Sequence, residues 1–385
     1  MTRDNSIFAA LAVGQSIWCD FLSRDLLRSG KLDEMIEAGV RGVTTNPSIF
    51  DNAIGKTSDY DGDILSMVRQ GKNREEIYTS LTVADVREAA DRFLPVFNGS
   101  GGKDGFVSLE VSPLLAHDSE GTVSEAETLA RLTGKKNVMI KIPATPEGMT
   151  AIRRCIALGI NVNATLIFSR EQYGQVAEAF IAGLEDRAAE GKTVSGIASV
   201  ASLFVSRVDT AVDKLLASGK TGGALAGKIA VDNARAAYMD FESLFSSPRW
   251  TVLAEKGAQV QRPLWASTGT KNPDYSPTLY VDSLIGPHTV NTIPPATLEA
   301  FLAAGTVGMT VASDREGMKR RLDELEALGA GALRLAAVEG DNEKGCFLAG
   351  QAAAMVKRIQ PAAEIVRELA EGAEPILKRA AEWVK

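Results

Sequence analysis

Lys141 is the residue whose position most directly suggests chemistry. It lies in NVMIKI, residues 137–142, an apolar run typical of a strand buried on both faces. Burial disfavours the charged ammonium and favours the neutral amine, a nucleophile that can form a Schiff base with a carbonyl substrate. The lysine could instead point outward along a neighbouring helix or pair with a carboxylate, and its position alone leaves these alternatives open.

Two carboxylates stand at the ends of other strand-like runs. Asp20 lies in SIWCDF (16–21) and Glu110 in GFVSLEV (105–111). In a parallel barrel the carboxyl ends of the strands form the face that carries the active site. Both side chains would then lie on the same face as an amine nucleophile and could move protons. Each could alternatively cap a helix or be solvated in a loop.

Uncharged polar residues also lie within or just after strand-like runs. Asn46 ends GVTTN (42–46), and Asn163 and Thr165 lie in INVNATLIF (160–168). Buried polar groups need hydrogen-bond partners, and bonds within a barrel interior would satisfy them. Recognition of substrate hydroxyls and of a catalytic water is the functional alternative.

Hydroxyl and cationic side chains gather near the later strands. Ser202 and Arg207 lie in SVASLFVSR, and Ser267, Thr268 and Lys271 lie in WASTGTKNP. Loops after the last strands of a barrel often bind phosphate, which a hydroxyl and a cation hold by charge-assisted hydrogen bonds. A surface turn is the alternative for each segment. The STGTK stretch lacks the complete P-loop pattern, so nucleotide binding has little support.

Strand-like runs alternate with helical patterns over most of the chain, which indicates parallel strands joined by right-handed crossovers. This pattern predicts an α/β fold, specifically a (β/α)8 TIM barrel. The eight predicted strands are 16–21, 42–46, 105–111, 137–142, 160–168, 194–200, 262–268 and 289–293.

Helix-capping residues support this alternation. Thr145 is a good N-cap, Pro146 suits a first helical turn and Gly159 suits a helix end. Ser169 and Gln172 match the spacing of a capping box. We therefore expect helices after the fourth and fifth strands.

A barrel of this kind needs about 250 residues, whereas the chain has 385. The additional material is expected in insertions near 51–104 and 208–261 and in a helical C-terminal extension after about 340. No convincing linker divides the sequence, so we predict a single barrel domain over 1–385.

Composition narrows the possible partners. With 42 Lys and Arg against 49 Asp and Glu, the formal net charge is -7, which argues against nucleic acid. No stretch approaches the roughly 18 apolar residues of a membrane span, and the first residues do not resemble a secretory signal. Cys19, Cys155, Cys346 and the two histidines form no disulfide or metal pattern. We expect a cytoplasmic protein that needs no metal or other cofactor.

Seven segments, in this order, give the chain a specific resemblance to the transaldolase family in its longer bacterial form, from about residue 14 to 305. These segments are SIWCDFLSRDLL, GVTTNPSIF, VSLEVSP, VMIKIPAT, GINVNATLIFS, SLFVSR and ASTGTKNP.

The resemblance implies a class I mechanism, in which Lys141 forms the Schiff base and Asp20 is the general acid and base. Glu110 and Thr165 match the pair that positions a catalytic water. Lys271 replaces a family arginine by chemistry rather than by alignment, as a second phosphate-binding cation. The other implied substrate-binding residues are Thr44, Asn46, Asn163 and Ser202 around the sugar, and Arg207 and Ser267 around the phosphate.

The implied activity is reversible transfer of a dihydroxyacetone unit from sedoheptulose 7-phosphate or fructose 6-phosphate to glyceraldehyde 3-phosphate or erythrose 4-phosphate. This is the transaldolase reaction (EC 2.2.1.2) of the non-oxidative pentose phosphate pathway. The expected partners are phosphorylated sugars, and the expected assembly is a monomer or homodimer. Two alternatives stay open: a true aldolase on the same scaffold, and a phosphosugar-binding module without activity.

Overall fold

The structure is a computed structural model that describes residues 5–218 and 224–337. It divides into two units, Met1–Leu325 and Glu326–Lys385, and the first contains the whole barrel. Within the second unit the described residues continue helix α15 (Arg315–Ala337). The predicted extension after about 340 lies outside the described residues, and the single domain over 1–385 stays a prediction.

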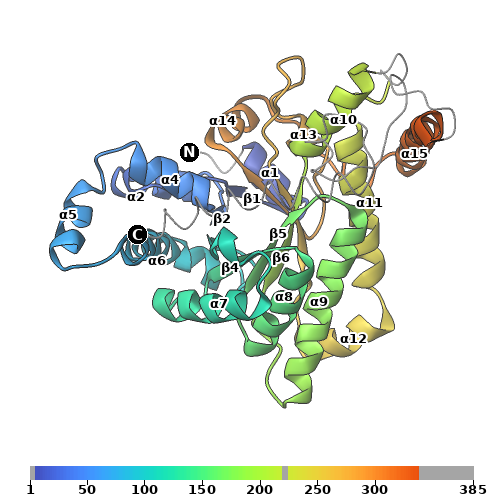
Figure 1. The fold of residues 1–385 in the computed structure, drawn as a ribbon. Helices are drawn as coiled ribbons and strands as arrows, with labels where there is room; N and C mark the ends of the chain where they lie inside the picture. Colours follow the sequence, from blue (N-terminus) through green and yellow to red (C-terminus); the bar gives the residue numbers. More distant parts are fainter. Residues whose placement is uncertain (1–4, 219–223, 338–385) are drawn as a thin grey trace, which may run out of the picture. The chain divides into compact units, whose positions relative to one another are not determined.

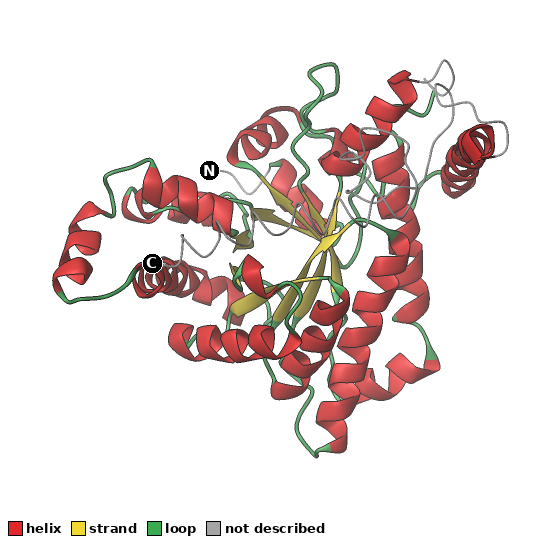
Figure 2. Cartoon of the chain, in the orientation of Figure 1, coloured by secondary structure: helices red, strands yellow, loops and turns green. Residues whose placement is uncertain are grey.

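Eight strands form a closed parallel barrel in chain order, with β8 beside β1, so the predicted (β/α)8 class is confirmed. Figure 2 shows the strands at the centre with helices around them. The strands are β1 (Gln15–Cys19), β2 (Gly42–Thr44), β3 (Phe106–Glu110), β4 (Val138–Pro143), β5 (Val162–Ile167), β6 (Ser199–Phe204), β7 (Arg262–Ala266) and β8 (Thr289–Ile293).

The sixth strand is displaced from its predicted position. The prediction was 194–200, but β6 spans Ser199–Phe204. Val194 and Ile197 are buried, yet they belong to the preceding loop, where Gly196 has a φ of +81° that no regular strand adopts. Residues 194–198 were therefore wrongly predicted as strand, although Val194 and Ile197 are buried. The shift places Ser202 inside the barrel wall.

Helices such as α7, α8 and α9 pack around the barrel strands (Figure 1). The helices of the described residues are α1 (Ser6–Ala12), α2 (Arg24–Arg28), α3 (Lys31–Glu37), α4 (Pro47–Gly55), α5 (Asp61–Arg69), α6 (Arg74–Gly99), η1 (Pro113–Leu115), α7 (Ser119–Thr133), α8 (Pro146–Leu158), α9 (Arg170–Ala189), α10 (Ser206–Ser218), α11 (Ile229–Leu244), α12 (Pro248–Glu255), α13 (Leu279–Asp282), α14 (Pro295–Ala304) and α15. Among the described residues, no helix combines the length and apolar character needed to cross a membrane.

The predicted end residues of α8 and the predicted N-cap of α9 are confirmed. Thr145 accepts a hydrogen bond from the Gly148 amide, and Gly159 ends α8 with a φ of +92°. Ser169 accepts from the Gln172 amide. The reciprocal bond of a capping box is displaced by one residue, because Gln172 accepts from the Phe168 amide.

Additional helices form insertions between two pairs of consecutive strands. Helices α4 to α6 separate β2 from β3, and α10 to α12 separate β6 from β7. Arg24 of α2 joins the first insertion to the barrel, since its guanidinium donates to Asp85 at 2.8 and 3.0 Å. The Tyr60 hydroxyl donates to the same carboxylate at 2.7 Å and accepts from the Arg24 amide. The buried Asp85 carboxylate thus has both an opposite charge, from Arg24, and hydrogen-bond donors, from Arg24 and Tyr60.

The barrel interior changes from apolar to polar along the strands. Side chains on one face of a strand recur every second residue. Four polar residues lie two positions after members of an apolar lower-barrel cluster: Asp20 directly after β1, Lys141 in β4, Ser202 in β6 and Thr292 in β8. The cluster itself consists of Trp18, Phe106, Met139, Ala198, Val200, Leu264, Ala266 and Val290. The polar layer therefore lies on its carboxyl-terminal side, where the strands end.

The amino-terminal end of the barrel is closed by Arg262, the first residue of β7. Its guanidinium donates to Asp104 at 3.0 Å, to the Ser16 hydroxyl at 2.6 Å and to the Thr289 carbonyl at 2.8 Å. These bonds join β7, β8, β1 and the segment before β3. Gly42 of β2 contributes to the tight packing nearby, because an added Cβ would lie 2.7 Å from the Trp18 ring.

Asp209, in the first turn of α10, gives stability a pH dependence. Its side chain is buried and accepts hydrogen bonds from the Ala230 amide at 2.8 Å and the Tyr280 hydroxyl at 2.9 Å. Burial nevertheless raises its pKa to about 6, from an ordinary value of 3.8. The folded state therefore binds this proton more tightly, and the resulting stabilisation is lost as the pH rises through about 6.

Asp209→Asn should remove this dependence, since an amide has no charge to desolvate and can still accept from Ala230. We expect the free energy of unfolding of the variant, relative to wild type, to increase by about 2 kcal/mol between about pH 4.5 and about pH 7.5. Urea unfolding at the two pH values measures the change. A difference between the proteins that is independent of pH would contradict the assignment.

Candidate active site

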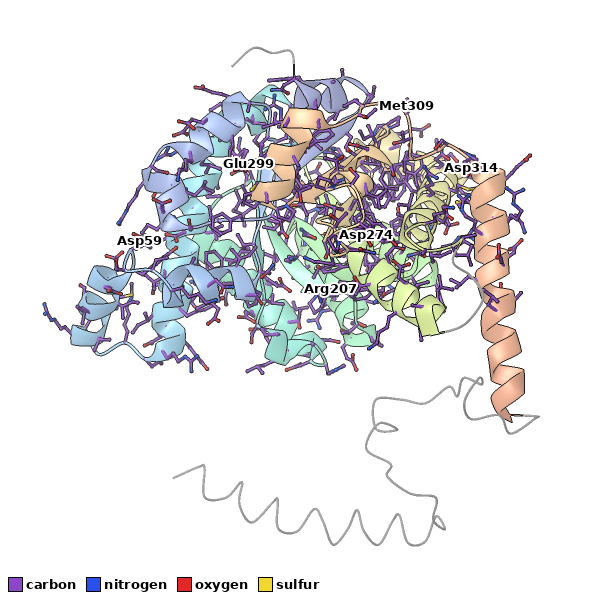
Figure 3. All side chains as sticks on the ribbon, turned by 90° about the horizontal axis from the view of Figure 1, so that it is seen from above. Asp59, Arg207, Asp274, Glu299, Met309 and Asp314 are labelled. Carbon is purple, nitrogen blue, oxygen red and sulfur yellow. The ribbon has the colours of Figure 1, made fainter. Side chains whose placement is uncertain are left out.

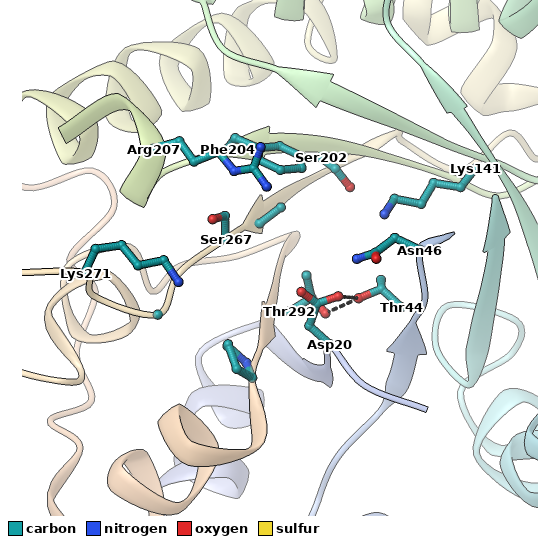
Figure 4. Close-up of a pocket in the computed structure, with 13 residues that line it drawn as sticks. Asp20, Thr44, Asn46, Lys141, Ser202, Phe204, Arg207, Ser267, Lys271 and Thr292 are labelled. Atoms are coloured by element: carbon teal, nitrogen blue, oxygen red, sulfur yellow. Dashed lines mark hydrogen bonds between the residues drawn. The ribbon is translucent and has the colours of Figure 1, made fainter. Parts of the chain in front are cut away.

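A cavity of about 200 Å³ lies at the carboxyl-terminal end of the barrel (Figure 4). Most of the predicted site residues line this cavity. The complete lining comes from five strands, β2, β4, β6, β7 and β8, and from the loops and helices that follow the strands. The lining consists of Asp20, Thr44, Asn46, Lys141, Ser202, Phe204, Arg207, Ala266, Ser267, Gly269, Lys271, Thr292 and Pro294.

Lys141 reaches the cavity from β4, a strand in which every residue is buried. Because Lys141 lines the cavity, its side chain faces the barrel interior, and the outward-pointing alternative is excluded. The amine donates a hydrogen bond to the Thr45 carbonyl at 3.2 Å. It also lies 3.2 Å from Glu110 Oε2, so the ion pair considered from the sequence is present as well.

Glu110 is held next to Lys141 by the register of β3 and β4, in which the two residues are partners. Burial raises the pKa of Glu110, and the Lys141 charge opposes that shift. A carboxyl whose acid form is favoured in this way is suited to carrying a proton. Apart from this ion pair with Lys141, Glu110 Oε2 has no hydrogen-bond partner in the described part of the chain.

Thr165 also has a buried polar atom without a hydrogen-bond partner in the described residues. Its hydroxyl is buried and has no hydrogen-bond partner within residues 5–218 and 224–337. Thr165 pairs with Pro143 of β4, two residues beyond Lys141. Thr165 and Glu110 lie outside the lining of the main cavity, on the two strands that flank β4. Each has, on a strand beside the lysine, a polar atom without a hydrogen-bond partner among the described residues.

Asn163 also lies outside the cavity lining. Its amide nitrogen donates to the Ser108 hydroxyl at 3.0 Å, and its amide oxygen accepts from Ser202 at 2.7 Å. The interior hydrogen bonding considered from the sequence is therefore observed. Asn163 joins β3, β5 and β6 and fixes the Ser202 hydroxyl, which does line the cavity.

Asn46 caps helix α4 and also lines the cavity. It is the N-cap of α4, where its side-chain oxygen accepts from the Ile49 amide at 2.9 Å and Pro47 starts the helix. Because the oxygen is used in this way, the amide nitrogen remains as a donor at the cavity wall. The sequence TTNP thus explains both the helix start and the direction of the donor.

A network of short hydrogen bonds holds Asp20. The Thr44 hydroxyl donates to Asp20 Oδ1 at 2.7 Å and lies 2.6 Å from the Thr292 hydroxyl. Thr292 was not predicted, although its strand was. The signal that could have identified it is the two-residue spacing from Val290 of the lower-barrel cluster. The other lining residues missed from the sequence are Phe204, Ala266, Gly269 and Pro294.

Positive charge occupies the end of the cavity away from Lys141. Figure 4 shows Arg207 and Lys271 there, with Ser202 and Ser267 nearer the centre. Neither cation forms an ion pair with a carboxylate of the described residues. The Arg207 guanidinium lies over the Phe204 ring, 5.3 Å from its centre.

Hydrogen bonds join the two segments that carry these cations, the start of α10 and the loop after β7. Ser267 follows β7 with a φ of +55°, an uncommon conformation for a residue other than glycine. Its carbonyl accepts from the Ser206 amide and its hydroxyl lies 3.0 Å from the Ser206 hydroxyl, which ties the β7 loop to the start of α10. In the view of Figure 3, Arg207 lies near the middle of the described structure, whereas Asp59 of the first insertion lies near its edge.

The arrangement provides an amine, a tethered carboxylate and cations around one cavity. No cluster of three or more His, Cys, Asp or Glu suited to holding a metal ion occurs in the described ranges. The chemistry available from these side chains is nucleophilic attack, proton transfer and anion binding.

The fold and the site together are those of an aldolase-type (β/α)8 barrel. The chain belongs to the transaldolase/fructose-6-phosphate aldolase family, whose model matches residues 17–339. It is 46% identical over 325 residues to a transaldolase of Trichodesmium erythraeum, covering 82% of this chain and 86% of the relative. It is 51% identical over 320 residues to transaldolase 1 of Streptomyces avermitilis, covering 82% and 85%. A Neisseria gonorrhoeae transaldolase is 47% identical over 326 residues, covering 85% and 92%. The family resemblance expected from the sequence is confirmed.

Proposed function

We propose that the chain is a transaldolase that moves a dihydroxyacetone unit between phosphorylated sugars through a Schiff base on Lys141. The observation that carries this proposal is the layout of the cavity. A buried amine lies at one end beside the Glu110 carboxylate, and Asp20 lines the same cavity. Arg207 and Lys271, which form no ion pair within the described residues, lie at the other end. A ketose phosphate has matching groups, a carbonyl near one end and a phosphate at the other.

In the first half of the reaction, the neutral Lys141 amine attacks the ketone carbon at C2. The carbinolamine then loses its hydroxyl as water, which requires one proton, and an imine forms. Glu110 is placed to exchange that proton, because its oxygen lies 3.2 Å from the amine and burial favours its acid form. Glu110 and Thr165 each have a buried polar atom with no hydrogen-bond partner among the described residues, which supports their role in positioning the water.

In the second half, Asp20 takes the proton of the C4 hydroxyl. The C3–C4 bond breaks, its electron pair moves toward the imine, and C4 becomes the carbonyl of the departing aldose phosphate. The three-carbon fragment stays on Lys141 as an enamine until another aldehyde arrives and the steps reverse. The Asn46 amide and the Ser202 hydroxyl are the polar groups available to orient the sugar.

The dependence of triose release on an acceptor tests the function. With fructose 6-phosphate alone, a transaldolase releases about one equivalent of glyceraldehyde 3-phosphate per active site and then stops. Addition of erythrose 4-phosphate restarts release. Sustained release without an acceptor would identify an aldolase. No release, from folded protein that binds the phosphosugar, would identify a binding module.

Arg207 is proposed to bind the substrate phosphate, with Lys271 and Ser267. Arg207→Ala should raise KM for fructose 6-phosphate by about 10- to 100-fold, because charge-assisted hydrogen bonds to the phosphate are lost. The effect on kcat should be smaller, since the phosphate is bound in both the ground and transition states. Steady-state kinetics measure this split, with Arg153→Ala as a control at an arginine paired to Asp186 on the surface. An unchanged KM would remove Arg207 from the phosphate site.

The proposed reaction places the chain in the non-oxidative pentose phosphate pathway. A cytoplasmic location follows from that assignment as a further expectation. Assembly as a monomer or homodimer also stays a prediction, which light scattering after size-exclusion chromatography can test.

A further inference from the structure

We propose that Thr292 is a positioning residue that orients the Asp20 carboxylate through Thr44, so that cleavage of the C3–C4 bond depends on a hydroxyl at position 292. This inference rests on the proposed function, because it concerns the step assigned to Asp20. It is carried by the hydrogen bonds that link β8, β2 and the end of β1.

The direction of the hydrogen bonds follows from counting protons. An ionised Asp20 can only accept, so the Thr44 hydroxyl, 2.7 Å away, gives its single proton to Asp20 Oδ1. Thr44 then has no proton left for Thr292. The contact of 2.6 Å between the two threonine hydroxyls therefore requires Thr292 to donate to Thr44. The chain runs from Thr292 to Thr44 to Asp20.

The two threonines are well shielded from solvent. Thr44 is 1% exposed and Thr292 is 2% exposed, so water competes little for these hydrogen bonds. The main chain adds to the restraint, because the Asp20 amide donates to the Ile293 carbonyl at 2.9 Å. Strand β8 thus holds Asp20 twice, once directly through Ile293 and once through Thr44.

This arrangement leaves one carboxylate oxygen for chemistry. Oδ1 is occupied by Thr44, so Oδ2 is the oxygen free to receive the C4 hydroxyl proton in the cavity that Asp20 lines. The Thr292 hydroxyl donates its single proton to Thr44, so it has none left to donate to the substrate. Its influence on the reaction therefore passes through Asp20, whose orientation it fixes.

Thr292→Val tests this inference, because valine has nearly the same shape and lacks the hydroxyl. Without its donor, Thr44 can rotate away from Asp20, and small displacements of a catalytic group cost up to about 100-fold in rate. We expect single-turnover release of glyceraldehyde 3-phosphate from fructose 6-phosphate to slow by about 10- to 100-fold. KM and the amount of adduct trapped on Lys141 by borohydride should change by less than about 3-fold. Thr292→Ser should restore release to within about 3-fold of wild type.

The single variant Thr44→Val and the double variant Thr44→Val/Thr292→Val test whether the two hydroxyls act in series. If Thr292 acts through Thr44, Thr292→Val should cause little additional slowing when Thr44 is already valine. Independent, additive effects would overturn the inference, as would wild-type release in Thr292→Val or failure of Thr292→Ser to recover. Should the valine variant not fold, comparison of Thr292→Ser with Thr292→Ala provides the same test. A wild-type protein that forms no adduct would instead reject the proposed function itself.

Discussion

Replacing Lys141 by methionine should abolish the covalent adduct with fructose 6-phosphate and lower turnover by at least about 10,000-fold. Methionine fills nearly the same space within the buried strand but has no amine to form an imine. Without the imine, the electrons of the breaking bond have no acceptor, and binding alone cannot replace covalent catalysis. The change also removes the cation beside Glu110, so that carboxyl should accept a proton more readily.

Intact mass after borohydride reduction measures the adduct. Wild-type protein incubated with fructose 6-phosphate should gain a three-carbon unit, and Lys141→Met should gain nothing. Lys136→Met is a matched control, since Lys136 is an exposed lysine just before the same strand. A three-carbon adduct on Lys141→Met would show that another lysine carries the chemistry.

The fold was predictable because buried parallel strands leave a clear pattern. Lys141 stood out as the single charge in an apolar strand, and its neighbourhood followed from the barrel order. Asp20 and Glu110 were predicted at strand ends for the same reason. The sixth strand was misplaced because two apolar runs adjoin there, and only pairing with β7, such as Phe204 with Ala266, selects the second.

The roles of other residues could not be deduced from local sequence. Thr292 and Thr44 are 248 positions apart, and their contact exists only because the barrel brings β8 and β2 to opposite sides of β1. Asn163 stays a predicted sugar-binding residue, and its hydrogen-bond partners Ser108 and Ser202, which lie on two other strands, could not be read from the sequence. Residue type indicated a polar interior, whereas the partner of each polar group depends on tertiary structure.

Asp20→Asn should separate imine formation from bond cleavage. Asparagine keeps the size of the side chain and can still accept from Thr44, but it cannot take the C4 hydroxyl proton. Loss of one general base typically costs about 100- to 10,000-fold. Since Lys141 is untouched, borohydride should now trap the intact six-carbon sugar phosphate on the protein in place of the three-carbon unit.

The mass of the adduct tests the role of Asp20 directly. The three-carbon and six-carbon adducts differ in mass by the whole departing aldose phosphate. Asp25→Asn, at an exposed carboxylate of α2 paired with Lys31, provides a control that should behave as wild type. Formation of the three-carbon adduct by Asp20→Asn at the wild-type rate would reject Asp20 as the base. Thr292→Val should show the same defect in a weaker form, with part of the trapped material as the six-carbon adduct, since it weakens the orientation of a carboxylate that is still present.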